Sequence, residues 1–100
     1  MTEIKDKTGF IIWEPRDHNI AEICDIVVEE SLRRQGNGKK LLNKAAAQMR
    51  KKEVRYCYVF TELTNVGAQR FYTAMGFNRV GDLLNFYSGT RHGVIFGRVI

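Results

Sequence analysis

The stretch DIVVEESLRRQGNGKKLLNKAAAQMRKK, positions 25–52, decides the fold. Its apolar start predicts the end of a strand that is covered on both faces. A loop with Gly36 and Gly38 follows, and residues 39–52 are rich in Leu, Ala, Lys, Gln and Met, which favour a helix. A strand that leads through such a loop into a helix directs several unpaired backbone N–H groups toward one point. The stretch therefore predicts an anion site, and phosphate is the expected ligand.

Further elements are predicted on both sides of this stretch. The first helix is long enough to be the crossover between two parallel strands. Gly76 supplies the left-handed residue expected after the second helix. The order β-β-α-β-α-β-β predicts the α/β (α+β) class, with a mixed, partly parallel sheet flanked by helices in one domain over residues 1–100. The strands are predicted at 9–13, 20–28, 55–61, 77–88 and 93–100, and the helices at 39–52 and from Thr64 or Asn65 to Met75.

The composition predicts a folded protein, since 44% of the residues are hydrophobic and 27% are charged. No apolar stretch reaches the roughly 18 residues that cross a bilayer, and the first residues lack the layout of a signal peptide. We therefore expect a cytoplasmic protein with no membrane partner. Cys24 and Cys57 are expected to be free thiols in strands, and no metal is expected because no cluster has metal-ligand spacing.

The basic charge of the chain is concentrated in one segment. The net charge is +5, but residues 33–55 contain nine basic side chains against the single acid Glu53, a net charge of +8. Such an excess suits an anionic partner, either a phosphorylated cofactor, a nucleic acid or a membrane surface. Arg33, Arg34 and Lys39 lie where the anion site is predicted. Nucleic-acid binding is not favoured, because the interleaved aromatic residues and motif spacing that base recognition needs are absent.

Two other types of glycine loop are excluded. A Walker A loop needs a glycine where Arg33 stands and a hydroxyl residue where Lys40 stands. The dinucleotide-binding fingerprint needs a third glycine where Leu41 stands. We therefore expect neither ATP hydrolysis of the Walker type nor binding of a dinucleotide.

Two motifs in this order carry a resemblance to a known family. The loop Arg33-x-x-Gly36-x-Gly38 resembles motif A of the GNAT acetyltransferases. The second stretch, Asn65-x-x-Ala68-x-x-Phe71-Tyr72-x-x-x-Gly76-Phe77, is similar to motif B of the same family and lies on the helix after the next strand, as the family requires. The resemblance extends from about residue 9 to the end of the chain.

The resemblance implies that acetyl-CoA is the acyl donor. In this family the loop N–H groups hold the coenzyme A pyrophosphate. The pantetheine arm pairs with the end of the strand before the loop, where a backbone N–H polarises the thioester carbonyl. Asn65 is expected to contact this arm from the other side. The cofactor-binding residues implied are Ile26, Val27, Val28, Arg33, Arg34, Gln35, Gly36, Asn37, Gly38, Lys39, Asn65, Phe71 and Tyr72.

The resemblance also suggests which residues transfer protons, because attack of an amine on a thioester needs a base and an acid. Tyr72 matches the family tyrosine that faces the coenzyme A sulfur, which implies that it is the general acid. Glu22 stands eleven residues before Arg33, the spacing of the glutamate in the histone-acetyltransferase branch, which implies that it is the general base. Asp25 and a relay through ordered water remain open as alternatives to Glu22.

The implied function is transfer of an acetyl group to a primary amine of a protein lysine, a protein N-terminus or a small molecule. Family members usually open with a strand and two helices that form a wall of the acceptor site, and we expect this chain to lack those helices. An open groove would admit a bulky amine, and a second subunit of a homodimer could complete it. An inactive coenzyme-binding module and a basic nucleic-acid-binding protein are the alternative functions.

Overall fold

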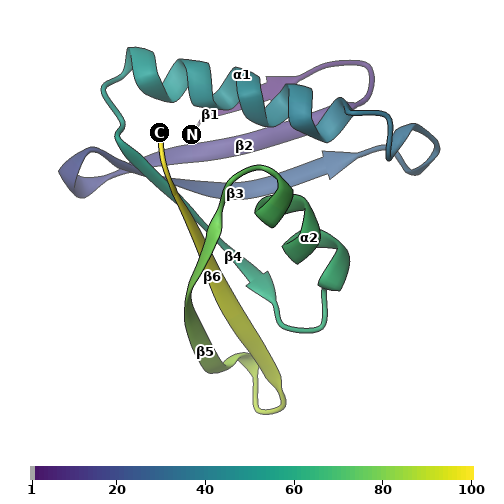
Figure 1. Cartoon of the computed structure of the whole chain (residues 1–100), viewed down its shortest axis with the longest axis vertical. Helices are drawn as coiled ribbons and strands as arrows, with labels where there is room; N and C mark the ends of the chain where they lie inside the picture. The colour runs from purple at the N-terminus through teal and green to yellow at the C-terminus, as the bar shows by residue number, and fades with distance from the viewer. Residues whose placement is uncertain (1) are drawn as a thin grey trace.

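The computed structural model describes residues 2–100 and contains one six-stranded sheet and two α-helices (Figure 1). The strands lie side by side in the order β1-β2-β3-β4-β6-β5. Only β3 and β4 are parallel, and every other neighbouring pair is antiparallel. The elements are β1 (Thr2–Lys5), β2 (Gly9–Arg16), β3 (Ile20–Val28), α1 (Asn37–Lys51), β4 (Tyr56–Glu62), α2 (Val66–Ala74), β5 (Asn78–Ser88) and β6 (Arg91–Val99), with short 3-10 turns at Asp17–Asn19 and Glu30–Leu32.

This architecture confirms the predicted mixed, partly parallel sheet with α1 as the crossover between two parallel strands. The predicted order was wrong in one respect, since it omitted β1. The segment Thr2–Lys5 has a single apolar residue, Ile4, and four residues carry little local preference for a strand. It forms a strand because it pairs with residues 10–13 of β2, which brings Ile4 against the core.

Both helices pack on the same face of the sheet. The buried side of α1, which includes Leu41 and Met49, belongs to one cluster with Ala21 and Ile23 of β3. Tyr72 of α2 belongs to the same cluster. Because side chains alternate along a strand, the neighbours of these β3 residues point to the opposite face, away from the helices.

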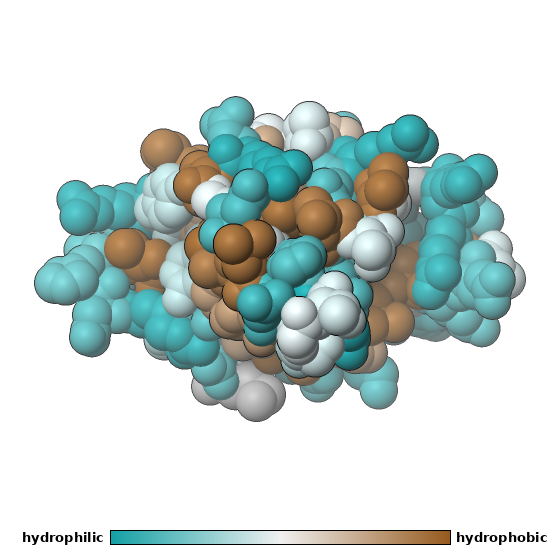
Figure 2. All heavy atoms as spheres, turned by 90° about the horizontal axis from the view of Figure 1, so that it is seen from below, coloured by the Kyte–Doolittle hydropathy of each residue, from teal (hydrophilic) through white to brown (hydrophobic). Residues whose placement is uncertain are grey.

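The end of the molecule that bears the β5–β6 turn is seen from below in Figure 2. Hydrophobic side chains gather in the middle of this view, and hydrophilic side chains dominate its two sides. Large apolar residues that stay exposed include Leu63 just before α2, Val66 at its start, and Val80, Leu84, Phe86 and Tyr87 of β5. Within residues 2–100, neither helix is long and apolar enough to span a lipid bilayer.

Trp13 of β2 is the largest fully buried side chain and fixes α1 on the sheet. Its indole Nε1 donates a hydrogen bond to Oε1 of Gln48 at 3.2 Å. The ammonium of Lys52 lies 5.6 Å from the centre of the ring, a cation–π geometry. One side chain therefore joins the central sheet to both the middle and the end of α1.

We expect Trp13→Ala to lower the free energy of unfolding by about 3–5 kcal/mol, because it leaves a cavity between β2 and α1. Denaturant unfolding measures this change. Leu84→Ala is the matched control, since Leu84 is 79% exposed and its truncation should change stability by less than about 0.5 kcal/mol. Similar losses in both variants would contradict the role given to Trp13.

Candidate functional site

The site begins where the two parallel strands separate. β3 and β4 are in register only at Ile20 with Tyr56, Ala21 with Cys57 and Glu22 with Tyr58. Beyond these pairs β3 continues to Val28 and β4 to Glu62, and the two strands diverge (Figure 1). The edge of residues 25–28 that faces β4 therefore has no strand partner, although the other edge pairs with β2.

A β-bulge accompanies this separation. Trp13 of β2 is in register with Ile23, but the preceding Ile12 is in register with Asp25. Cys24 is thus the extra residue on β3. A bulge bends its strand and increases the local twist, which turns the second half of β3 away from β4.

The separated strands enclose a cavity of about 880 Å³. Its walls come from residues 24–28 of β3, residues 59–61 of β4, the glycine loop and the inner side of α2. The predicted site residues that line this cavity are Ile26, Val27, Val28, Arg33, Arg34, Gly36, Gly38, Lys39, Asn65, Phe71 and Tyr72. Residues predicted from two distant motifs are therefore brought together around one space.

The glycine loop ends in the first turn of α1, which has no side-chain cap. Gly36 takes the N-cap position in the left-handed conformation with φ of 79°, which favours glycine. No atom lies within 4 Å of the position that a Cβ of Gly36 would occupy, so a ligand can approach the backbone there. The unpaired N–H groups of this turn and the helix dipole favour an anion.

Gly38 allows α1 and α2 to approach each other. A Cβ at this position would lie 3.1 Å from the Phe71 ring and 3.7 Å from a methyl group of Val28. A side chain here would press on the wall of the cavity. The two glycines of the loop thus serve separate purposes, since Gly36 adopts the left-handed conformation and Gly38 leaves space for the Phe71 ring.

Gln35 and Asn37 do not line the cavity, although the sequence places them in the loop that does. Their side chains hold the loop together instead. The Asn37 amide donates to the carbonyl oxygen of Leu32 at 2.8 Å, and the Gln35 amide donates to that of Ser31 at 3.3 Å. Any contact that these two residues make with a ligand must therefore come from the backbone.

Tyr72 is only 4% exposed, and its ring packs between aromatic neighbours. The ring centres of Phe71 and Phe77 both lie 5.4 Å from that of Tyr72. Burial raises the pKa of the Tyr72 hydroxyl well above its ordinary value, and the negative charge of Asp25 raises it further. The hydroxyl therefore keeps its proton through the neutral and moderately basic range.

The Tyr72 hydroxyl opens to the cavity. No hydrogen bond joins it to another residue in the part of the chain that the structure describes. In the same residues, every buried side-chain nitrogen or oxygen has a hydrogen-bond partner. The unpartnered hydroxyl of Tyr72 must therefore reach solvent, and the cavity that it lines is the route.

Asn65, one of the two residues predicted to cap this helix, is the N-cap of α2. Its Oδ1 accepts a hydrogen bond from the backbone N–H of Ala68 at 3.1 Å. The side-chain oxygen is therefore occupied, and the amide nitrogen is the group left for a ligand in the cavity. Gly67, in the same first turn of α2, also lines the cavity.

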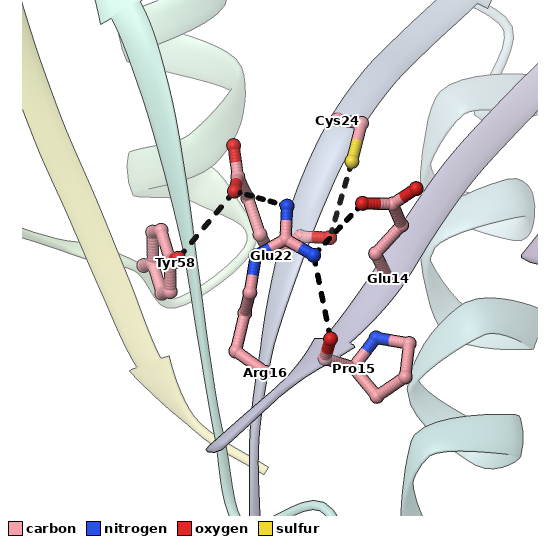
Figure 3. A network of polar contacts seen from close by, with 6 residues as sticks. All are labelled: Glu14, Pro15, Arg16, Glu22, Cys24 and Tyr58. Carbon is pink, nitrogen blue, oxygen red and sulfur yellow. Dashed lines mark hydrogen bonds and ion pairs between the residues drawn. The ribbon is translucent and has the colours of Figure 1, made fainter. Parts of the chain in front are cut away.

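Glu22 lies apart from these residues, on the face of the sheet away from the helices (Figure 3). Its Oε1 accepts a hydrogen bond from Nη2 of Arg16 at 2.8 Å and a longer one from the Tyr58 hydroxyl at 3.4 Å. Arg16 also binds Glu14 at 2.8 Å. Glu22 does not line the cavity, and its role as general base stays a prediction.

The β4 wall, which includes Val59 and Thr61, was missing from the residues predicted from the sequence. The predicted parallel pairing placed this strand next to β3, and that pairing could have indicated that β4 residues line the site. Asp25, which the sequence left open as an alternative base, does line the cavity, and it directly follows the bulge at Cys24. Both cysteines are free and lie in strands, as predicted, with Cys24 exposed and Cys57 buried.

The charges of the cavity wall are separated. The basic side chains Arg33, Arg34 and Lys39 lie at the loop, whereas Asp25 is the single acidic residue of the wall. The arrangement can hold an anion at the loop and an extended chain along the open edge of β3, with a proton donor at Tyr72. Among residues 2–100, no three His, Cys, Asp or Glu side chains are grouped so that they could hold a metal ion.

Solved structures of acetyltransferases are similar to this chain. Ard1 from Thermoplasma volcanium is 27% identical with a TM-score of 0.86, and the match covers 93% of this chain and 63% of that protein. The ribosomal-protein-S18-alanine N-acetyltransferase from Escherichia coli is 25% identical with a TM-score of 0.80, covering 93% and 61%. A candidate streptothricin acetyltransferase from Bacillus anthracis str. Ames, solved in complex with acetyl coenzyme A, is 26% identical with a TM-score of 0.88, covering 93% and 56%.

This chain thus spans less than two thirds of the length of each of these three proteins. A search of curated protein sequences gave no significant match. The sequence profile of the Acetyltransferase (GNAT) family matches residues 5–77, which include β2 to α2 and both motifs. The fold, the two motifs around one cavity and this match agree, and the chain belongs to the GNAT acetyltransferase family.

Proposed function

We propose that this protein transfers the acetyl group of acetyl-CoA to a primary amine. The observation that carries the proposal is the convergence of three features on one cavity: an anion-binding loop, an open strand edge and the hydroxyl of Tyr72. Acetyl-CoA has the matching parts in the same order, since its pyrophosphate, its amide-bearing arm and its thioester follow one another.

The donor would bind with its pyrophosphate at the first turn of α1, where Gly36, Gly38 and Lys39 lie. Arg33 and Arg34 would add attraction from the same end of the cavity. The amides of the arm would pair with the free edge of residues 26–28 like an added strand. Phe71 and Asn65 would contact the arm from α2.

Tyr72 would be the general acid in the transfer. When the amine nitrogen attacks the thioester carbon, the C–N bond forms, the C–S bond breaks and the electron pair stays on sulfur. The leaving thiolate needs a proton, and a tyrosine with a raised pKa still carries one at the pH of the reaction. The three aromatic neighbours of Tyr72 hold its ring in place.

The acceptor is proposed to be an amine of a protein, either an N-terminus or a lysine. The similar enzyme from E. coli is named for acetylation of an alanine of ribosomal protein S18, which supports an N-terminus. The wide opening between β3 and β4 supports a bulky acceptor.

The donor site is tested by titration calorimetry with acetyl-CoA. We expect Gly38→Glu to weaken binding by roughly 30- to 150-fold, corresponding to about 2–3 kcal/mol, because a carboxylate would face the pyrophosphate. Gly89→Glu is the matched control, since it makes the same change in the β5–β6 turn, where the position of the missing Cβ has no neighbour within 4 Å. No binding by the natural sequence, or equal binding by both variants, would refute the assignment of the loop.

The acid is tested by Tyr72→Phe. We expect kcat for acetyl transfer to fall by about 10²- to 10⁴-fold, since the proton donor is lost, while the affinity for acetyl-CoA stays within about twofold, since the ring and its packing remain. Tyr56→Phe removes a hydroxyl from a residue that does not line the cavity and should leave kcat unchanged. A large loss of donor affinity with unchanged kcat would show that Tyr72 is a binding residue instead.

A further inference from the structure

Cys24 lies at the β-bulge of β3, where this strand separates from β4. The residue is exposed and belongs to the cavity wall that β3 contributes. Within residues 2–100 it is in register with no residue of a neighbouring strand, since β2 pairs with Ile23 and Asp25 and the pairing with β4 ends at Glu22. A molecule that enters the cavity can therefore reach Cys24 without displacing a strand.

The Cys24 thiol is also free of strong interactions. Its Sγ donates a hydrogen bond to the carbonyl oxygen of Glu22 at 3.8 Å, and a thiol is a weak donor (Figure 3). The other cysteine of the chain, Cys57, is fully buried in β4 and does not line the cavity. Cys24 is thus the thiol that a molecule in the cavity can meet.

Tyr72 gives an independent indication of a ligand in the same cavity. It lines the wall that α2 contributes, and it is only 4% exposed. Its hydroxyl has no hydrogen-bond partner in residues 2–100 and opens to the cavity. Because a buried polar group needs a partner, a molecule that fills the cavity must present an atom that bonds to this hydroxyl.

The length of the coenzyme A arm matches the distance from the glycine loop to Cys24. About twelve bonds separate the phosphate oxygen of the arm from its sulfur, and an extended residue adds about three bonds to a chain, so the arm spans roughly four residues. Val28 adjoins the loop, because its carbonyl oxygen accepts a hydrogen bond from Arg33 at 3.0 Å, and Cys24 is four positions before it. An arm that lies along the open edge of β3 with its phosphate at the loop therefore brings its sulfur to Cys24.

We propose that Cys24 is a modification site for coenzyme A, at which the thiol forms a mixed disulfide with the sulfur of the arm. The proposal rests on the proposed donor site and adds a means of regulating it. A coenzyme A molecule bound through Cys24 occupies the place of acetyl-CoA and stops acetyl transfer until a thiol reductant releases it.

The oxidant is the symmetrical disulfide of coenzyme A, one half of which would occupy the loop and the open edge. The Cys24 thiolate attacks the sulfur of this half, so that a bond from Cys24 to that sulfur forms and the original S–S bond breaks. The other half leaves as a thiolate and takes up the proton that Cys24 lost. Cys24 is thereby oxidised, one coenzyme A sulfur is reduced to a thiol, and the total number of disulfides is unchanged.

The surroundings of Cys24 make this reaction selective. Burial raises the pKa of its thiol, and the negative charge of Glu22 raises it further. Because the thiolate is the attacking form, Cys24 reacts slowly with a disulfide that meets it only by collision. A disulfide anchored at the glycine loop is instead held beside the thiol at a millimolar effective concentration.

The test compares coenzyme A disulfide with glutathione disulfide, each at the same micromolar concentration, on the natural sequence. Intact-mass spectrometry measures the rate at which the adduct forms, and peptide mapping locates it. We expect coenzyme A disulfide to modify Cys24 at least about 30-fold faster than glutathione disulfide does. After the unbound disulfide is removed, acetyl transfer should be lost, and dithiothreitol should remove the adduct and restore the activity.

Three variants separate a directed reaction from the chemistry of an exposed thiol. Cys24→Ser should form no adduct, because Cys57 is buried. Ser88→Cys, added to Cys24→Ser, places an exposed thiol on β5 outside the cavity, and the two disulfides should modify it at rates within about threefold of each other. Gly38→Glu keeps Cys24 and should slow modification by coenzyme A disulfide about 30-fold without changing the rate with glutathione disulfide.

The outcomes distinguish this proposal from the function on which it rests. Equal rates with the two disulfides would show an ordinary exposed thiol and overturn the proposal. A natural chain that binds acetyl-CoA but forms no adduct would overturn it as well and leave the donor site standing. Selective modification of Cys24 in a chain that transfers no acetyl group would instead refute the proposed transfer and support the coenzyme A site.

Discussion

The brevity of the parallel pairing between β3 and β4 is the constraint on which the rest of the structure depends. Three pairs of residues hold the strands together, and beyond them each strand keeps its outer partner while the inner edges separate. A sheet paired along its whole length would have no free edge in its middle and no space for a ligand. The open edge remains stable because β2 and β6 satisfy the outer edges and the helices cover one face.

The cavity that results is divided by chemistry as well as by shape. Its loop end combines backbone N–H groups with basic side chains, and its middle is lined by apolar and aromatic groups. Its wall also carries the buried phenol of Tyr72 and the carboxylate of Asp25, which forms no ion pair within residues 2–100. The pyrophosphate, the arm and the thioester of acetyl-CoA need three different surroundings. A single strand, β3, runs along the whole length of the cavity wall that would contact them. The position of a residue along β3 therefore decides which part of the reaction it can serve.

Much of this could be predicted from the sequence, because glycine spacing and helix caps are local. The turn before α1 requires a left-handed residue, and glycine at position 36 supplies it without tertiary contacts. Asn65 caps α2 by accepting a hydrogen bond from a residue only three positions away. The strand β1 could not be predicted, since it depends on pairing with β2. The spacing that suggested Glu22 assumes a regular strand, and the bulge at Cys24 changes the side-chain alternation after that residue. The register of Asp25 with Ile12, which places it on the same face as Glu22, is thus a tertiary property.

The hydrogen bonds inside the glycine loop have a consequence for the kinetics of donor binding. Arg33 Nε donates to the Val28 carbonyl at 3.0 Å and Asn37 donates to Leu32, so the loop is fixed by its own side chains. A ligand that meets a preorganised cradle loses little conformational entropy of the protein on binding. The association rate constant for such a loop is set by diffusion and by the attraction between its basic side chains and the anionic ligand. Differences in affinity then arise mainly from the dissociation rate constant.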